Sequence, residues 1–358
     1  MMMKKRLAMI TAIMLAAGTV LVGCKGSDAS TGSSTASKDE GGKSASEGSD
    51  NGMVLRLGHV VADGNSLDKG LDKFAELVEE KSEGSLTIEV YPNSELGDNT
   101  AMAEQLQMGT LDMMAPSTAA LSGFTSAMSV FDVPYLFKNE AAAEEILDGE
   151  IGQDVASALE ESGFHVLSYM TQGWRNLTCK KEVTAPEDMK GIKIRTMDSQ
   201  YHMQHFNAFG ASATPMAMSE VYTALQQGTI DAQENPYTNI VNSRFYEVQD
   251  YVVETQHIYD ADPLMVSTIT WGKLSDDQKS ILEEAAKEAT AWEREEVLKD
   301  VDKDKQTILD SGTKIIELTD DQRAAFREAA QEVYDSFEAA ASGNKELIEQ
   351  IEAVNDEK

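Results

Sequence analysis

The pattern of apolar and polar positions alternates between two periods along most of the chain. Residues 54–59 and 86–90 alternate as short strands, and between them Leu67, Leu71 and Phe74 follow the spacing of an amphipathic helix over residues 66–82. The same reasoning predicts helices at about 100–108, 139–162, 199–209 and 219–227, and strands at 111–115, 164–170, 191–195 and 229–233. We therefore expect an α/β protein with largely parallel sheets wrapped by helices.

Two further patterns concern the architecture. A single long, charged helix is predicted over about 275–309, with more helix toward the C-terminus. Residues 106–112 and 225–231 resemble each other, because in both a helix ends at glycine and leads into a strand that carries an aspartate. Such junctions are common enough to arise by coincidence, but the identities are in register, so we favour two similar α/β lobes.

The N-terminal segment is typical of an export signal. Lys4, Lys5 and Arg6 precede an apolar run over residues 7–22, which predicts a signal peptide over residues 1–23. Leu21-Val22-Gly23-Cys24 matches the lipobox of bacterial lipoproteins, whose cysteine thiol carries diacylglycerol. An ordinary cleaved signal with a chance cysteine is the alternative. Charge, apolar run and cysteine position together favour lipidation of Cys24, and hence an extracytoplasmic protein anchored to the cell membrane by its lipid.

Residues 24–52 are predicted to form a disordered tether. They are rich in Ser, Gly, Asp, Lys and Glu and almost free of large apolar side chains, so they cannot bury enough surface to offset chain entropy. The whole chain of 358 residues carries a formal charge of −32, which disfavours nucleic-acid and membrane-surface roles. An anionic ligand remains compatible with this charge, because a binding site needs only a local pair of cations.

Polar side chains at predicted strand ends are the first candidates for a site. Open α/β sheets bind ligands at the carboxyl ends of their strands. Arg195 ends the apolar strand at 191–195, Asn235 stands just before Pro236, and Arg175 follows Trp174. A guanidinium can grip a carboxylate with two parallel hydrogen bonds, to which an amide adds another polar contact. From the pattern alone, each arginine is more often a surface or structural ion-pair residue.

Several ordered stretches together resemble the substrate-binding subunits of tripartite ATP-independent periplasmic (TRAP) transporters, the family of C4-dicarboxylate and sugar-acid binders. The resemblance runs from about residue 54 to at least 287. The matching stretches are 91–97, 132–137, 175–178, 191–195, 215–222, 225–228, 233–236 and 245–249.

The resemblance implies a two-lobed clamshell of the periplasmic-binding-protein type, with crossing strands and a long helix joining the lobes. One lobe would comprise 53–172 plus 261–300, and the other 173–260 plus 301–358. Arg195 occupies the position at which the family has the arginine that binds the ligand carboxylate. Arg175 occupies the position of a second arginine that contacts the ligand, and Asn235 that of an asparagine that contacts it. Met218 replaces an aromatic residue common there, which suggests a more adaptable apolar wall.

The resemblance also implies a function: capture of a small organic acid and its delivery to TRAP membrane subunits. The acid could be a C4-dicarboxylate, a uronate or aldonate, or a keto acid. Sialic acid is disfavoured, because Asn99, Ser117 and Ala120 stand where sialic-acid binders carry charged residues. Asn99 and Ser117, with His59, are expected to contribute to choice among acids. Gln172, Trp174, Tyr237 and His59 are further candidate contacts, for which core or rim packing is an equal alternative.

Other functional classes are less well supported. A carboxylate binder with a sensory role is one alternative, and a surface enzyme is another, but there is no Gly-x-Ser-x-Gly elbow and Cys179 has no obvious partner. His202 and His205 could share a metal from one helix, although a solvated or half-buried pair is favoured. A structural or adhesive lipoprotein would show repeats or all-β spacing. We therefore expect that the protein is not an enzyme and that it binds no metal and no cofactor.

Overall fold

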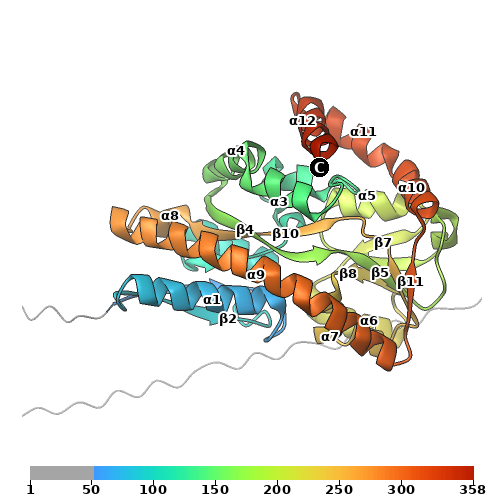
Figure 1. The fold of residues 1–358 in the computed structure, drawn as a ribbon, viewed down its shortest axis with the longest axis horizontal. Coiled ribbons are helices and arrows are strands. Elements are labelled where there is room, and N and C mark those ends of the chain that lie inside the picture. The colour runs from blue at the N-terminus through green and yellow to red at the C-terminus, as the bar shows by residue number, and fades with distance from the viewer. Residues whose placement is uncertain (1–51) are drawn as a thin grey trace, which may run out of the picture. The chain divides into compact units, whose positions relative to one another are not determined.

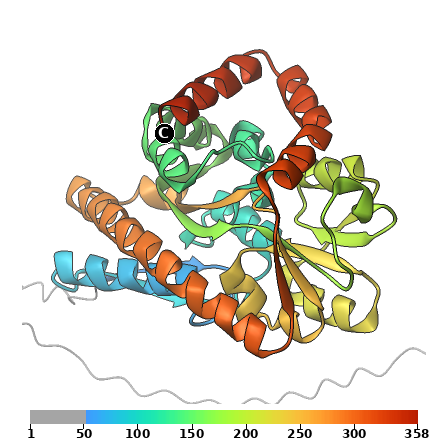
Figure 2. The ribbon, with the colours of Figure 1, turned by 45° about the vertical axis from the view of Figure 1, so that its right-hand side comes forward.

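The computed structural model describes residues 52–358, which contain two β-sheets with helices packed on both (Figures 1 and 2). The predicted signal peptide, Cys24 and nearly all of the predicted tether lie outside the described residues. No helix within 52–358 is both long and apolar enough to cross a membrane.

The first sheet is five-stranded, in the order β2-β1-β3-β10-β4. Its strands are β1 (Met53–Gly58), β2 (Leu86–Tyr91), β3 (Met113–Met114), β4 (Phe164–Trp174) and β10 (Tyr259–Ser267). β1 runs parallel to β2 and β3, whereas β10 runs antiparallel to β3 and β4. Helix α1 (Ser66–Lys81) follows the prediction, because Leu71 and Phe74 are buried against this sheet.

The second sheet is six-stranded, in the order β11-β9-β5-β8-β6-β7. Its strands are β5 (Asn176–Cys179), β6 (Lys193–Thr196), β7 (Ser212–Pro215), β8 (Ala232–Asn235), β9 (Tyr251–Glu254) and β11 (Lys314–Glu317). β5 is antiparallel to both β8 and β9, while the other pairs are parallel. Both sheets are therefore mixed, and the expectation of largely parallel sheets is corrected.

The remaining helices frame the sheets. They are α2 (Asn99–Met108), α3 (Glu140–Asp148), α4 (Glu150–Ala158), α5 (Gln200–Ala208), α6 (Met218–Gln227), α7 (Tyr237–Asn242), α8 (Thr268–Trp271), α9 (Asp276–Asp310), α10 (Asp320–Ala329), α11 (Gln331–Ala340) and α12 (Asn344–Glu357). Short 3-10 turns complete the connections, at Thr118–Leu121, Ala127–Asp132, Glu160–Ser162, Pro186–Met189 and Phe245–Glu247.

The long helix α9 spans both sheets and confirms the prediction. Over 35 residues it packs first beside α1 and β4, and then against α7 and β11 (orange in Figures 1 and 2). Its start is fixed by a capping box, in which Ser275 Oγ accepts from Gln278 N and Gln278 Oε1 accepts from Ser275 N. Together with the consecutive strands β4 and β5, this helix gives the two-lobed α/β fold that we expected.

Two predicted helical stretches are interrupted. The predicted helix 139–162 divides into α3 and α4 at Gly149, which adopts an extended backbone and precedes α4. A side chain at Gly149 would meet the carbonyl oxygen of Glu145, so the turn between the helices requires glycine here. Toward the C-terminus, β11 interrupts the predicted helix, because Ile315 and Ile316 pair with β9.

The internal repeat is confirmed in the structure. α2 ends at Gly109 and α6 at Gly228, both in the left-handed region with φ of 67° and 69°. The aspartate that follows caps a neighbouring strand in each case: Asp112 Oδ2 accepts from Arg56 N at 3.0 Å, and Asp231 Oδ2 accepts from Lys193 N at 3.0 Å. The same junction is thus built once in each sheet.

The residue numbers at which we divided the lobes stay a prediction. The apolar side chains of α11 and α12, which that division assigned to the second lobe, join the same buried cluster as Phe131 and Tyr169. Tyr334 Oη donates to Pro134 O at 2.8 Å, and Asn355 Nδ2 donates to Leu136 O at 2.8 Å. The C-terminal helices therefore reach back to the core beside the first sheet.

Candidate functional site

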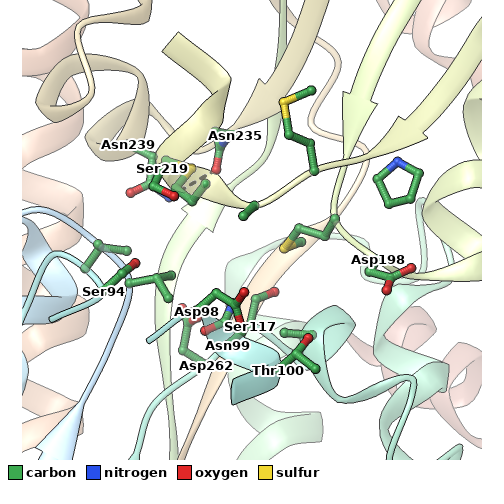
Figure 3. A pocket seen from close by; sticks show the side chains of 18 of the residues that line it. Ser94, Asp98, Asn99, Thr100, Ser117, Asp198, Ser219, Asn235, Asn239 and Asp262 are labelled. Atoms are coloured by element: carbon green, nitrogen blue, oxygen red, sulfur yellow. Dashed lines mark hydrogen bonds between the residues drawn. The ribbon is translucent and has the colours of Figure 1, made fainter. Parts of the chain in front are cut away.

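A cleft of about 570 Å³ opens between the two sheets (Figure 3). The segments that line it follow the carboxyl ends of β1, β2 and β3 in the first sheet and of β6, β7 and β8 in the second. The sequence predicted this location, because parallel strands leave a crevice at their carboxyl ends. Most predicted contacts line the cleft: Arg175, Arg195, Asn235, Met218, Asn99, Ser117 and Gln172, together with Ala120.

Arg195 is a buried cation that forms no ion pair with any described residue. It lies in β6, is 4 % exposed and lines the cleft. Its Nε donates to Met216 O at 2.8 Å, but its two terminal nitrogens make no hydrogen bond or ion pair with any residue between 52 and 358. Burial lowers the pKa of Arg195 to about 10; the charges of Glu234 and Asp260 oppose this effect, and that of Arg175 adds to it. The side chain remains charged at neutral pH and lacks a counter-ion.

Arg175, in contrast, is fully engaged by the protein. Its Nε donates to Glu234 Oε2 at 2.5 Å and its Nη1 to Asp260 Oδ2 at 2.5 Å. Its Nη2 donates to the main-chain oxygen of Glu234 at 2.8 Å and to Oε1 of the same residue at 2.9 Å. Burial alone would lower the pKa of Arg175, but the charges of Asp260 and Glu234 outweigh burial and raise it. One guanidinium thus pairs with two carboxylates.

A buried histidine, His257, contacts Glu234 of this cluster. His257 Nε2 lies 3.0 Å from Glu234 Oε2, and its Nδ1 lies 2.8 Å from Thr255 Oγ1. Burial lowers the pKa of His257, so it is neutral at pH 7 and can donate one hydrogen bond to Glu234. Burial alone would raise the pKa of Glu234, but the charge of Arg175 and the hydrogen bonds from His257 and Arg175 together lower it.

His202 and His205 belong to the core rather than to a metal site. Both are 1 % exposed on α5, and His205 packs edge-on against Tyr135 and Phe209. Within the described part of the chain, no group of three or more His, Cys, Asp and Glu side chains is arranged to hold a metal ion. The pair is more deeply buried than the sequence suggested.

Asn235 and Met218 contribute to the second-sheet side of the cleft. Asn235 Oδ1 accepts from Arg175 Nη2 at 3.3 Å and from Asn239 Nδ2 at 3.1 Å, which fixes the amide at the end of β8. Met218 begins α6 and lines the cleft together with Met216 and Met197. Three flexible thioethers therefore form an adaptable apolar wall.

The opposite side of the cleft is polar and acidic. Ser117 Oγ donates to Asp260 Oδ1 at 2.6 Å, and Gln172 Nε2 donates to Asp262 Oδ1 at 3.2 Å. Burial and then the charge of Asp260 raise the pKa of Asp262 well above its ordinary value. Figure 3 shows Asp98, Asn99, Ser117 and Asp262 gathered on one side of the cleft, opposite Asn235, Asn239 and Ser219.

Three candidate contacts do not line the cleft. His59 is fully buried, with Nε2 3.0 Å from Asp68 Oδ1 at the start of α1. Trp174 packs edge-on against Tyr259, with ring centroids 5.3 Å apart. Tyr237 Oη donates to Glu254 Oε1 at 2.8 Å. All three side chains pack in the core or at its edge, which is the alternative that the sequence left open.

The sequence did not single out Glu234 and Asp260, which pair with Arg175, or the nearby Asp262. Asp260 and Asp262 both lie on β10, whose nine residues are all buried. Acidic side chains are almost never buried without a partner. Two aspartates at alternate positions of a buried strand could therefore have indicated a buried cation beside them. This signal was missed because β10 was not predicted. The missed cleft residues also include Asp98, Glu104, Asp198, Glu220 and Asn239.

A protein family and several known proteins match this chain. Residues 57–340 match the family described as bacterial extracellular solute-binding protein, family 7. The 2,3-diketo-L-gulonate-binding periplasmic protein of Escherichia coli is 34% identical over 302 residues, covering 84% of this chain and 92% of the relative.

Two solved structures of TRAP-type and sugar-acid binding proteins are similar. The TRAP periplasmic solute-binding protein of Sulfurospirillum deleyianum, with bound succinate, has a TM-score of 0.80 at 32% identity, covering 84% of this chain and 99% of the other. The sugar acid binding protein of Advenella mimigardefordensis, in complex with galactonate, has a TM-score of 0.82 at 30% identity, covering 86% and 98%.

These relatives are ligand-binding proteins rather than enzymes, and their family is extracytoplasmic. The match covers both sheets and the whole cleft, since it extends from β1 to the end of α11. The TRAP resemblance inferred from the sequence is therefore confirmed. The chain belongs to family 7 of the bacterial extracellular solute-binding proteins, the DctP family.

Proposed function

We propose that this protein captures a small organic acid outside the cytoplasm and delivers it to the membrane subunits of a TRAP transporter. The observation that carries the proposal is Arg195, whose terminal nitrogens lack any partner among the described residues while the side chain lines the cleft. The relatives support the same ligand class, because their names specify 2,3-diketo-L-gulonate, succinate and galactonate.

A ligand carboxylate would supply the anion that Arg195 lacks. Its two oxygens match the spacing of the two terminal nitrogens, so two parallel charge-assisted hydrogen bonds can form. The attraction is strengthened by the burial of the guanidinium, since water screens it weakly there. Arg175 cannot play the same part without giving up its bonds to Glu234 and Asp260, so we assign it to holding the cleft wall and Asn235.

Substitution of Arg195 tests this proposal. Arg195→Ala removes a bidentate ion pair and should cost about 2–5 kcal/mol of binding free energy, or roughly 30-fold to several-thousand-fold in Kd. Arg195→Lys should also lose at least about tenfold, because an ammonium cannot form the fork. Isothermal titration calorimetry with succinate, gluconate and glucuronate measures both effects.

The matched control is Arg244→Lys, because the Arg244 side chain is 69 % exposed and pairs only with Glu247 among the described residues. This variant should bind like the wild type. Binding by Arg195→Lys within a few-fold of wild type would remove Arg195 from the anchoring role.

We also propose that Cys24 carries a lipid that anchors the protein to the cell membrane. The support is the order of basic residues, apolar run and Cys24 in the sequence. Radiolabelled palmitate should enter the wild-type chain and not a Cys24→Ser chain, which should be recovered in the soluble fraction with ligand binding intact. Cys179→Ser is the control and should keep the label. Membrane retention of Cys24→Ser would indicate a different attachment.

A further inference from the structure

We infer that the cleft selects a polyhydroxylated monocarboxylate, such as an aldonate or uronate, over a dicarboxylate. This inference rests on the proposed function and specifies its ligand. The relatives leave the choice open, since one solved structure holds succinate and another galactonate. The charges and the unpaired acceptors of this cleft decide between the two classes.

The cleft offers unpaired guanidinium nitrogens to one carboxylate. Arg175 and Arg195 are the only basic side chains among the described residues that line it. Arg175 already pairs with both Glu234 and Asp260, each within hydrogen-bonding distance of its guanidinium. Arg195 alone has terminal nitrogens without a partner among the described residues, so it can pair directly with one ligand carboxylate.

A second carboxylate would meet acidic groups. The lining includes Asp98, Glu104, Asp198, Glu220, Asp260 and Asp262. Asp98 and Asp262 lie with Asn99 and Ser117 on the side opposite Asn235 (Figure 3). An anion placed there would gain no cation, and the charge of Asp98 would repel it.

The same region offers free hydrogen-bond acceptors. Gln172 Oε1 and Asn99 Oδ1 are buried, and neither receives a hydrogen bond from the described residues. Both residues line the cleft, and Gln172 is only 5 % exposed. The hydroxyl proton of Ser117 is already committed to Asp260. A ligand hydroxyl can donate to these acceptors, whereas an ionised carboxylate can only accept.

Two matched ligands isolate the effect. Gluconate and glucarate share six carbons and four interior hydroxyls and differ at the last carbon, which is an alcohol in one and a carboxylate in the other. Calorimetry on the wild-type chain should show gluconate or glucuronate binding at least about tenfold more tightly than glucarate and succinate. Hexanoate, which has the single carboxylate without hydroxyls, should also bind at least about tenfold more weakly than gluconate.

A variant of the acidic side provides the second readout. Asp98 Oδ1 caps α2 by accepting from Ala101 N at 2.8 Å, and asparagine can keep that cap. Asp98→Asn should therefore bind glucarate about three- to tenfold more tightly while changing gluconate binding less than about threefold. Asp154→Asn is the control, because Asp154 is exposed on α4 and does not line the cleft.

The outcomes separate this inference from the proposed function. If succinate or glucarate bound as tightly as gluconate and glucuronate, the inference would be overturned. If Arg195→Lys lost binding in the same experiment, the proposed function would still stand. An unchanged ratio of glucarate to gluconate affinity in Asp98→Asn would contradict the part assigned to the acidic side. If none of these acids bound to the wild-type chain, both proposals would fail.

Discussion

At the residue scale, the two cleft arginines are in opposite electrostatic states. Arg175 lies between Glu234 and Asp260, and removal of its charge would leave two buried carboxylates without a cation. Arg195 has no carboxylate partner within the described chain, and its burial is reflected in a pKa lowered to about 10. One arginine therefore stabilises the empty protein, while the other is kept buried and unpaired for a ligand.

This contrast predicts opposite effects on stability. Arg175→Met should lower the free energy of unfolding of the ligand-free protein by about 3–5 kcal/mol, because it leaves buried charges uncompensated. Arg195→Met should leave it unchanged or raise it, since the substitution replaces an unpaired buried cation with an apolar side chain. Urea denaturation followed by circular dichroism measures both changes. A loss of several kcal/mol in Arg195→Met would show that Arg195 has a structural partner.

Individual residues could be predicted where they end a strand. Arg195 was identified because it ends an apolar strand, and Asn235 because it ends a predicted strand just before Pro236; both line the cleft. The partners of Arg175 could not be found in this way, because Asp260 comes from β10, 85 positions along the chain. His59 and Tyr237 are polar residues near strand ends too, but each is occupied by an aspartate or glutamate inside the protein.

At the scale of elements, local signals predicted the helices better than the strands. α1 and α9 have clear apolar periodicity or caps, and the structure reproduces them within a few residues. β5, β7, β9 and β11 have four residues each, and each pairs with a neighbouring strand. Their formation depends on tertiary pairing rather than on local sequence.

The strand β10, which carries two acidic residues of the cleft, was not predicted from the sequence. β10 is buried along its whole length, and it carries Asp260 and Asp262 where a buried strand normally has apolar side chains. Its antiparallel pairing with β4 brings Asp260 opposite Gly173, two residues before Arg175. The sequence separation of the two strands hid this pairing, although it builds the charged wall of the cleft.

At the scale of the whole described molecule, few polar contacts join the two sides of the cleft directly. Asn65 Nδ2 donates to Asn239 Oδ1 at 2.9 Å, and Ser199 Oγ donates to Asp132 Oδ2 at 2.9 Å. A ligand that contacts Arg195 on one side and Gln172 or Asn99 on the other would add its own bonds across the gap. Such a ligand binds the closed arrangement more tightly than any open one, and thereby shifts the population toward closure.

The most direct test of this account is a crystal structure of the protein with the acid that binds it most tightly in calorimetry. We expect both carboxylate oxygens within about 3.2 Å of the two terminal nitrogens of Arg195. Ligand hydroxyls should donate to Gln172 Oε1 and Asn99 Oδ1. A carboxylate bound on the side of Asp98 and Asn99, or a ligand held with Arg195 still unpaired, would contradict the account.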